Sequence, residues 1–300
     1  MALAPRAVFV YRHTELDELL ATHGTFGQAV FFLSQRGQKI EEVERRDRLQ
    51  KDALATSTAA VPMNWRQGSV ERSDLARFSF APEDVVVVVG QDGLVANAAK
   101  YLDGQTVIGV NPDKARNPGV LVPFRPHQVH SLLSLAVSSA AEAFTEERVM
   151  VEATTDDRQS VLALNEVFIG HPSHQSARYL ISVGGDGPEP QSSSGMIIAT
   201  GTGATGWARS IWEERGRDVP LPDPTEHRLC WFVREAWPSP ATGIRLTAGL
   251  LDADASLSLT VESDRLVAFG DGIEEDAVPL RFSQVVKVQV ATRKLRLLTG

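Results

Sequence analysis

The sequence contains one cysteine, no long hydrophobic run and no excess of basic residues, and each absence excludes a class of protein. Cys230 stands alone in the apolar run 229–233, so a disulfide framework or a cysteine-based zinc site within one chain is excluded, and a buried structural thiol is expected. No apolar run is long enough to cross a bilayer, and the first residues lack a secretory core. The net charge of −8 is atypical of nucleic-acid-binding proteins. These features predict a cytoplasmic protein that binds neither membranes nor nucleic acids.

The composition that remains is that of an ordinary folded protein, with 300 residues of which 43% are hydrophobic and 23% charged. Strand and helix patterns alternate over the first part of the chain, including a short strand over 57–61, and predict βαβ units around a parallel sheet. Prolines near residue 125 mark a boundary, after which a helix is expected over 127–144. The following short strands, separated by turn residues, predict a mainly antiparallel β domain.

A buried strand over residues 84–89 ends in the turn 90–93, which reads Gly-Gln-Asp-Gly. Its five consecutive valines leave no polar face, as in a parallel strand that helices cover on both sides. Apolar residues at helical spacing over 94–102 predict a helix directly after the turn. Open α/β sheets bind ligands beyond the carboxyl ends of their strands, where the N–H groups at a helix start can bind anions. Asp92 is therefore either a helix cap or a catalytic carboxylate.

The next predicted strand, over 105–111, also ends in a loop with charged residues. The loop carries Lys114 and Arg116 among Pro, Asn, Asp and Gly residues that are typical of turns. Two cations in one β–α turn and a carboxylate in the preceding turn are consistent with a phosphate site. Solvated surface cations are the alternative.

Two stretches in the second half are unusual for a purely structural role. Asn165 and Glu166 interrupt an apolar strand predicted over 161–169, where a buried amide or carboxylate must find a partner in the backbone or in a ligand. Residues 200–207, Thr-Gly-Thr-Gly-Ala-Thr-Gly-Trp, leave a strand and enter a helix over 207–214. Their glycines allow a ligand to approach the backbone, and the threonines and the tryptophan supply hydroxyls and a stacking surface. A flexible surface turn is the alternative.

These motifs, in this order, resemble those of the NAD kinase family, and their details are closest to its mitochondrial-type branch. The family's Gly-Gly-Asp-Gly turn, Asn-Glu pair and threonine-rich segment correspond to residues 90–93, 165–166 and 200–207. The resemblance covers about residues 85–300 and implies a fold of the α/β plus all-β class. It implies a Rossmann-like domain over 1–125, a β-rich, sandwich-like domain over 126–275, and a last segment, 276–300, that returns to the first domain.

The resemblance also implies a chemical role for each motif. Asp92 would be the base that takes the proton from the ribose 2′-hydroxyl of NAD, with ATP as phosphate donor, a divalent cation such as Mg²⁺ to offset charge, and NADP as product. The expected assembly is a homodimer. The residues expected to bind the phosphates and the dinucleotide are Gly90, Gln91, Gly93, Lys114, Arg116, Asn165, Glu166, Thr200, Thr202, Gly203, Thr205 and Trp207.

Three functions stay open at the level of sequence, because Gln91 replaces the second glycine of the family's turn. They are an ATP-dependent NAD kinase, a kinase of the same fold that acts on another nucleoside or nucleotide hydroxyl, and a catalytically silent dinucleotide-binding protein. Retention of Asp92 disfavours the third. Gln91 disfavours the first, because a positive φ there would cost about 1 kcal/mol or more.

Overall fold

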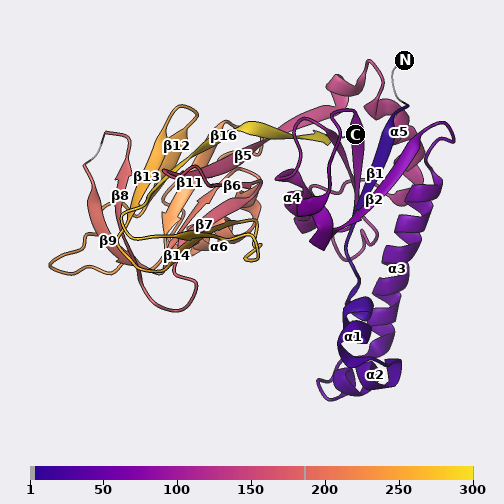
Figure 1. Cartoon of the computed structure of the whole chain (residues 1–300), viewed down its shortest axis with the longest axis horizontal. Helices are drawn as coiled ribbons and strands as arrows, with labels where there is room; N and C mark the ends of the chain where they lie inside the picture. Colours follow the sequence, from indigo (N-terminus) through magenta and orange to yellow (C-terminus); the bar gives the residue numbers. More distant parts are fainter. Residues whose placement is uncertain (1–3, 186, 300) are drawn as a thin grey trace. The chain divides into compact units, whose positions relative to one another are not determined.

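The protein, described by a computed structural model over residues 4–185 and 187–299, is divided into two units (Figure 1). Unit 1 contains the described residues up to Glu146 and those from Arg296 on, and unit 2 is Glu147–Leu295. The contacts thus divide the chain after Glu146, whereas the prolines near residue 125 predict the boundary there. Residues between these positions stay with unit 1 because Val129, Leu132 and Leu133 pack into its core. The predicted combination of an α/β part and an antiparallel β part is confirmed.

Unit 1 contains a parallel sheet with the strand order β2-β1-β3-β4. All six residues of β3 are buried, as its valines predict. The end of β16 adds a further parallel strand, because Arg296 and Leu297 pair with Thr106 and Val107 of β4. The strands and helices of unit 1 are β1 (Arg6–Tyr11), α1 (Glu15–His23), α2 (Phe26–Ser34), α3 (Ile40–Ala59), β2 (Arg66–Glu71), β3 (Asp84–Val89), α4 (Asp92–Ala99), β4 (Thr106–Val110) and α5 (Val129–Ala136).

Helices α1 and α2 lie at the end of α3 that is remote from strands β1 and β2 (Figure 1). Thr14 begins α1 with a capping box, in which its hydroxyl accepts from the Asp17 N–H and the Asp17 side chain accepts from the Thr14 N–H. The strand predicted over 57–61 is wrong, because α3 continues to Ala59. The single helix predicted over 127–144 is also wrong, since α5 ends at Ala136 and short turns follow.

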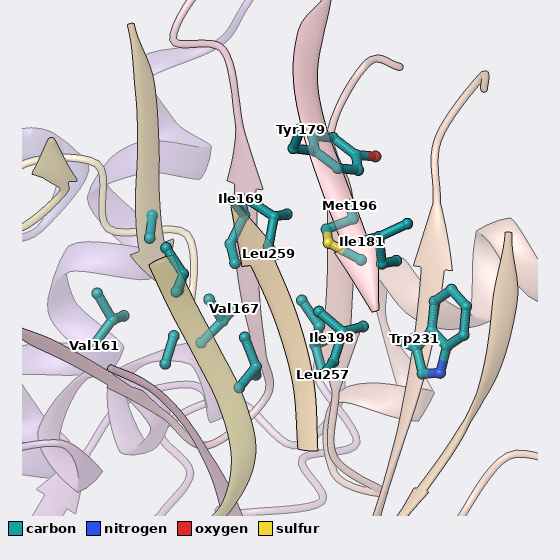
Figure 2. Packing of buried hydrophobic residues seen from close by; sticks show 14 of the residues in the cluster. Val161, Val167, Ile169, Tyr179, Ile181, Met196, Ile198, Trp231, Leu257 and Leu259 are labelled. Carbon is teal, nitrogen blue, oxygen red and sulfur yellow. The ribbon is translucent and has the colours of Figure 1, made fainter. Parts of the chain in front are cut away.

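Unit 2 consists of two sheets that share one apolar core (Figure 2). One sheet has the antiparallel order β12-β11-β10-β7-β14-β15, and the other joins β16, β13, β8 and β9, with β5 paired to β16 and β6. Tyr179 and Ile181 of β8 meet Met196, Ile198 and Trp231 of the facing sheet in this core (Figure 2). The core therefore fixes the two sheets against each other.

Most strands of unit 2 match predicted strands. One predicted strand is divided into two, at residues that matter for function. The strand predicted over 161–169 is two strands, with a break at Leu164 and Asn165. The apolar pattern over 278–290 predicts one strand, but these residues belong to two strands, β15 and β16. Strand β9 (Glu189–Ser193) lacks an apolar pattern. The elements are β5 (Thr145–Thr155), β6 (Ser160–Ala163), β7 (Glu166–Gly170), β8 (Ala177–Val183), β9 (Glu189–Ser193), β10 (Met196–Ala199), α6 (Trp207–Glu214), β11 (Arg228–Val233), β12 (Ala248–Asp252), β13 (Ser256–Val261), β14 (Leu266–Gly270), β15 (Val278–Leu280) and β16 (Val285–Leu298).

Two expectations from composition can be compared directly with the fold. The single thiol is buried, and burial raises the pKa of Cys230 to about 12, so the predicted structural thiol is confirmed. Among the described residues, no helix has the length and apolar character needed to span a bilayer.

Candidate functional site

The turn after β3 leads directly into α4, whose first residue is Asp92. Gln91 is the N-cap residue, with extended backbone at φ −103° and no capping hydrogen bond from its side chain. The strain considered for a positive φ at Gln91 is therefore absent. A Cβ atom at Gly93 would meet no described atom within 4 Å. Packing inside unit 1 thus gives no reason for glycine at this position, and the helix start is open to a ligand.

The Asp92 carboxylate binds the loop that follows β4. Its Oδ1 accepts from the Leu121 N–H at 2.8 Å, and its Oδ2 accepts from the Val120 N–H at 3.0 Å. The helix-cap alternative for Asp92 is wrong, because the residue lies inside the helix and its carboxylate is bound to a distant loop. A carboxylate has about four lone-pair sites, so Asp92 can accept a further hydrogen bond from a ligand. The two N–H groups fix the direction in which that lone pair points.

Lys114 and Arg116 lie on the loop after β4 and already have partners within unit 1. The Lys114 ammonium donates to the Pro123 carbonyl, and the Arg116 guanidinium lies 3.9 Å from the Glu42 carboxylate of α3. Both side chains are exposed. Within the described part of the chain, neither cation is paired with Asp92. The proposed phosphate site of these cations therefore stays a prediction.

In unit 2, the break between β6 and β7 is held by Asp271. The Asp271 carboxylate accepts from the Asn165 N–H at 2.7 Å and from the Leu164 N–H at 2.9 Å, and the Asp271 N–H donates to the Glu166 carbonyl at 3.1 Å. Asp271 adopts φ +54°, a left-handed conformation that its position after β14 requires. Asp271 is not among the site residues predicted from the sequence, although the Gly-Asp-Gly run at 270–272 marks its position.

The side chains of Asn165 and Glu166 remain without a hydrogen-bond partner among residues 4–185 and 187–299, although their backbone groups are satisfied. Both residues are half-buried. Burial, and then the nearby charge of Asp271, raise the pKa of Glu166 to about 7. Two half-buried polar side chains that lack hydrogen-bond partners among the described residues are suited to bind a ligand that carries hydroxyl and amide-like groups.

The threonine-rich segment after β10 packs against Asn165. The buried Thr200 hydroxyl donates to the Leu164 carbonyl at 2.6 Å and accepts from the N–H groups of Thr202 and Gly203. A Cβ atom at Gly203 would lie 2.1 Å from the Asn165 carbonyl oxygen, so only glycine fits there. The structure thus brings the two predicted motifs of unit 2 together.

Thr202 contributes a third polar side chain without a partner among the described residues. Its residue is 5% exposed, and its hydroxyl makes no hydrogen bond to any described atom. The exposed Thr205 hydroxyl, by contrast, donates to the Thr202 carbonyl at 3.0 Å. A buried hydroxyl without a hydrogen-bond partner lowers the stability of the fold by about 1–3 kcal/mol, and a ligand atom that bonds to it removes this cost.

Trp207 begins α6 and is partly covered by other side chains. Its ring stacks on Phe168 with a centroid distance of 5.7 Å, and the Arg234 guanidinium carbon lies 5.3 Å from the ring centroid. Its exposed fraction is 37%. The area available for stacking on a ligand is therefore limited. Arg234, which sequence reasoning also missed, adds a cation beside this ring.

The described residues contain no preformed cluster of metal-binding side chains. Among them, no group of three or more His, Cys, Asp or Glu side chains is arranged to hold a metal ion. At the turn after β3, Asp92 offers carboxylate oxygens of the kind that Mg²⁺ prefers.

Comparisons with known proteins point to one group of enzymes, although no family model matches the chain. The chain is 34% identical to mitochondrial NAD kinase 2 of Rattus norvegicus, over 43% of this chain and 40% of that protein. It is 32% identical to the NAD kinase of Ralstonia nicotianae, over 42% of this chain and 43% of the relative. With the NAD kinase of Methanospirillum hungatei, the identity is 30% over 61% and 63% of the two chains. The matches to the first two relatives thus span less than half of their length.

Proposed function

Because the resemblance to the NAD kinase family is confirmed, we propose that this chain transfers the terminal phosphoryl group of ATP to the adenosine-ribose 2′-hydroxyl of NAD, giving NADP. One observation supports this most directly. Asn165, Glu166 and Thr202 present polar side-chain groups without partners at a single place in unit 2. Buried polar groups are normally hydrogen-bonded, so such a group of atoms favours a polar ligand.

A dinucleotide supplies the missing partners. The Asn165 amide can donate to and accept from a base edge or a ribose, and the Glu166 carboxylate accepts from hydroxyl groups when it is ionised. Hydrogen bonds from a ligand to that carboxylate would lower the pKa of Glu166 from about 7. The Thr202 hydroxyl lies on the segment that packs against Asn165 and would complete the set.

In unit 1, Asp92 is the residue we assign to the chemical step. As the 2′-oxygen attacks the terminal phosphorus, the bond from that phosphorus to ADP breaks and the hydroxyl proton moves to the Asp92 carboxylate. The two N–H groups of the 120–121 loop orient this carboxylate. The open surface at Gly93 lets phosphate oxygens approach the N–H groups of the helix start. A Mg²⁺ ion bound to ATP would offset the phosphate charge, and Asp92 supplies the type of oxygen that suits it.

A second candidate is a kinase of another nucleoside or nucleotide hydroxyl. The exposed Gln91 side chain favours it, because this side chain stands at the phosphate turn where the NAD kinase pattern has glycine. The backbone of Gln91 is unstrained and therefore does not oppose NAD phosphorylation. A Rossmann-like assignment for unit 1, supported by its β2-β1-β3-β4 order, also stays a proposal, as do the homodimer and the cytoplasmic location.

The test is an assay of phosphate transfer from ATP with Mg²⁺ to a panel of NAD, NADH, nucleosides and nucleotides. In parallel, Asn165→Ala should weaken acceptor binding about two- to ten-fold, because a hydrogen bond between neutral groups contributes about 0.5–1.5 kcal/mol. Its melting temperature should change little, since the amide has no partner in the described chain. The exposed Asn64→Ala is the matched control. Unchanged acceptor affinity in Asn165→Ala, or a panel in which nothing is phosphorylated, would refute the proposal.

A further inference from the structure

A cavity of about 420 Å³ lies at the carboxyl end of β1, in unit 1. Its walls come from the end of β1, from α1 and from α3, and include Tyr11, Leu20, Gln50, Lys51 and Leu54. None of these residues belongs to the dinucleotide site proposed above. The volume is within the range of about 300–1,000 Å³ that is typical of small-molecule sites.

The cavity lies at the point where the strand order reverses. From β1 the chain proceeds to β2 on one side, and the next strand, β3, pairs with β1 on its other side. Sheets with this topology bind their ligands outside the carboxyl ends of the two strands at the reversal. Gln50 of α3 links the cavity to the second of these strands, because its Nε2 donates to the Val89 carbonyl, at the end of β3, at 2.8 Å.

The lining indicates an uncharged, flat ligand group. Tyr11, Leu20 and Leu54 are half-buried and offer an aromatic ring and two aliphatic side chains. The lining also contains cationic side chains, and these face carboxylates. The Lys51 ammonium lies 2.9 Å from Asp17 and 2.7 Å from Asp47, the Arg12 guanidinium lies 3.1 Å from Glu18, and the His13 ring lies 3.9 Å from Asp17. The cavity is therefore poorly suited to a phosphate. A nucleobase stacks on an aromatic ring and needs only a few polar contacts, which the Gln50 side chain can supply.

We infer that this cavity binds the nucleoside of the phosphate donor, with the phosphates extending to the turn 90–93. The turn begins at the residue after Val89, whose carbonyl is bonded to Gln50, so the base site and the phosphate site are contiguous. The inference rests on the proposed kinase function for the identity of the ligand as a nucleoside triphosphate. The cavity itself and its position at the strand reversal do not depend on that function.

Calorimetric titration of the whole chain with ATP and with inorganic tripolyphosphate, both with Mg²⁺ and without acceptor, tests this inference. Wild type should bind ATP more tightly than tripolyphosphate. Tyr11→Ala should weaken ATP binding about five- to a hundred-fold, because a base–aromatic stack contributes about 1–3 kcal/mol, and should leave tripolyphosphate binding unchanged. Leu20→Ala should act in the same direction. Phe31→Ala, at an exposed phenylalanine of α2 outside this cavity, is the control and should change neither affinity.

Three results would overturn the inference: equal affinity of wild type for ATP and tripolyphosphate, unchanged ATP affinity in both folded variants, or equal weakening of both ligands. Melting temperatures identify a variant that does not fold. If Tyr11→Ala is such a variant, Leu20→Ala decides. Because binding is measured without acceptor, a chain that binds ATP here but phosphorylates no acceptor would refute the proposed function and support this inference.

Discussion

Replacing Glu166 with glutamine should increase the stability of the protein at high pH. Burial and the charge of Asp271 raise the pKa of Glu166 from its ordinary value of 4.5 to about 7. The folded chain therefore binds more protons than the unfolded chain between these two values. It follows that the free energy of unfolding falls as the pH rises through this window.

The size of the effect follows from the shift in pKa. At 1.36 kcal/mol per pKa unit, the ionised carboxyl costs the folded state up to about 3 kcal/mol above pH 7. Because the side chain is partly exposed, this value is an upper limit. Glutamine has the same shape and no charge, so Glu166→Gln should recover this free energy above pH 7 and give little gain near pH 4.

Urea unfolding of wild type and Glu166→Gln from pH 4 to pH 8.5 measures this difference directly. The difference between the two chains removes the contribution of the titrating groups that do not interact with Glu166. A stability difference for Glu166→Gln that is equal at pH 5 and pH 8.5 would show that the carboxyl does not titrate in this range, and would refute the reasoning.

Ionisation of Glu166 should strengthen ligand binding, although it lowers the stability of the fold. An ionised Glu166 accepts hydrogen bonds from ribose hydroxyls, so acceptor affinity of wild type should rise as the pH increases through about 7. In Glu166→Gln the affinity should be lower and independent of pH in this range. Titrations of NAD binding at pH 6, 7 and 8 distinguish the two chains.

Two further predictions concern the remaining polar groups. Asp92→Asn should lower the turnover of the kinase reaction about 100-fold or more, because an amide cannot accept the proton. It should cost about 0.5–1.5 kcal/mol of stability, because only one of the two loop N–H groups keeps an acceptor. Val120→Pro removes one of those donors and keeps the carboxylate, so it should share the loss of stability but lower turnover much less than Asp92→Asn does. Thr202→Val should leave stability equal or higher and weaken acceptor binding, whereas Thr200→Val, which removes a hydroxyl with three hydrogen bonds, should destabilise the fold.

For each of these two predictions, one experimental result would contradict the expected outcome. Equal turnover in Asp92→Asn and Val120→Pro would assign Asp92 a purely structural role. A loss of stability in Thr202→Val, with unchanged acceptor affinity, would mean that its hydroxyl serves the fold and not a ligand.

Local chemistry made much of this protein predictable from its sequence. Five valines without a polar face can only form a strand that is covered on both sides, and β3 is buried along its whole length. Thr14 and the acids after it predict the start of α1, and the structure has a capping box there. Helix α6 begins and ends at the predicted residues, Trp207 and Glu214. In these cases the deciding interactions lie within a few residues of one another.

Where sequence reasoning failed, the deciding partner lies far along the chain. Strand β9 has no apolar pattern, because Gln191 and Ser193 are buried with polar partners on other segments, the Leu246 carbonyl and the Tyr179 hydroxyl. The pattern over 161–169 predicts one strand, yet the Asp271 carboxylate binds two N–H groups at Leu164 and Asn165 that would otherwise pair with a neighbouring strand.

Periodicity and turn chemistry act locally, so the α/β and β-rich parts of the chain and the residues of the candidate motifs can be predicted from the sequence. The state of the side chains in these motifs depends on the fold. The carboxylate of Asp92 is bound to a loop 28 residues away, while the side chain of Glu166 is left without a partner in the described chain and its pKa is raised to about 7. Such differences depend on which distant backbone N–H groups the fold brings within hydrogen-bonding distance and on which carboxyl it removes from water, and neither quantity is present in the local pattern of residues.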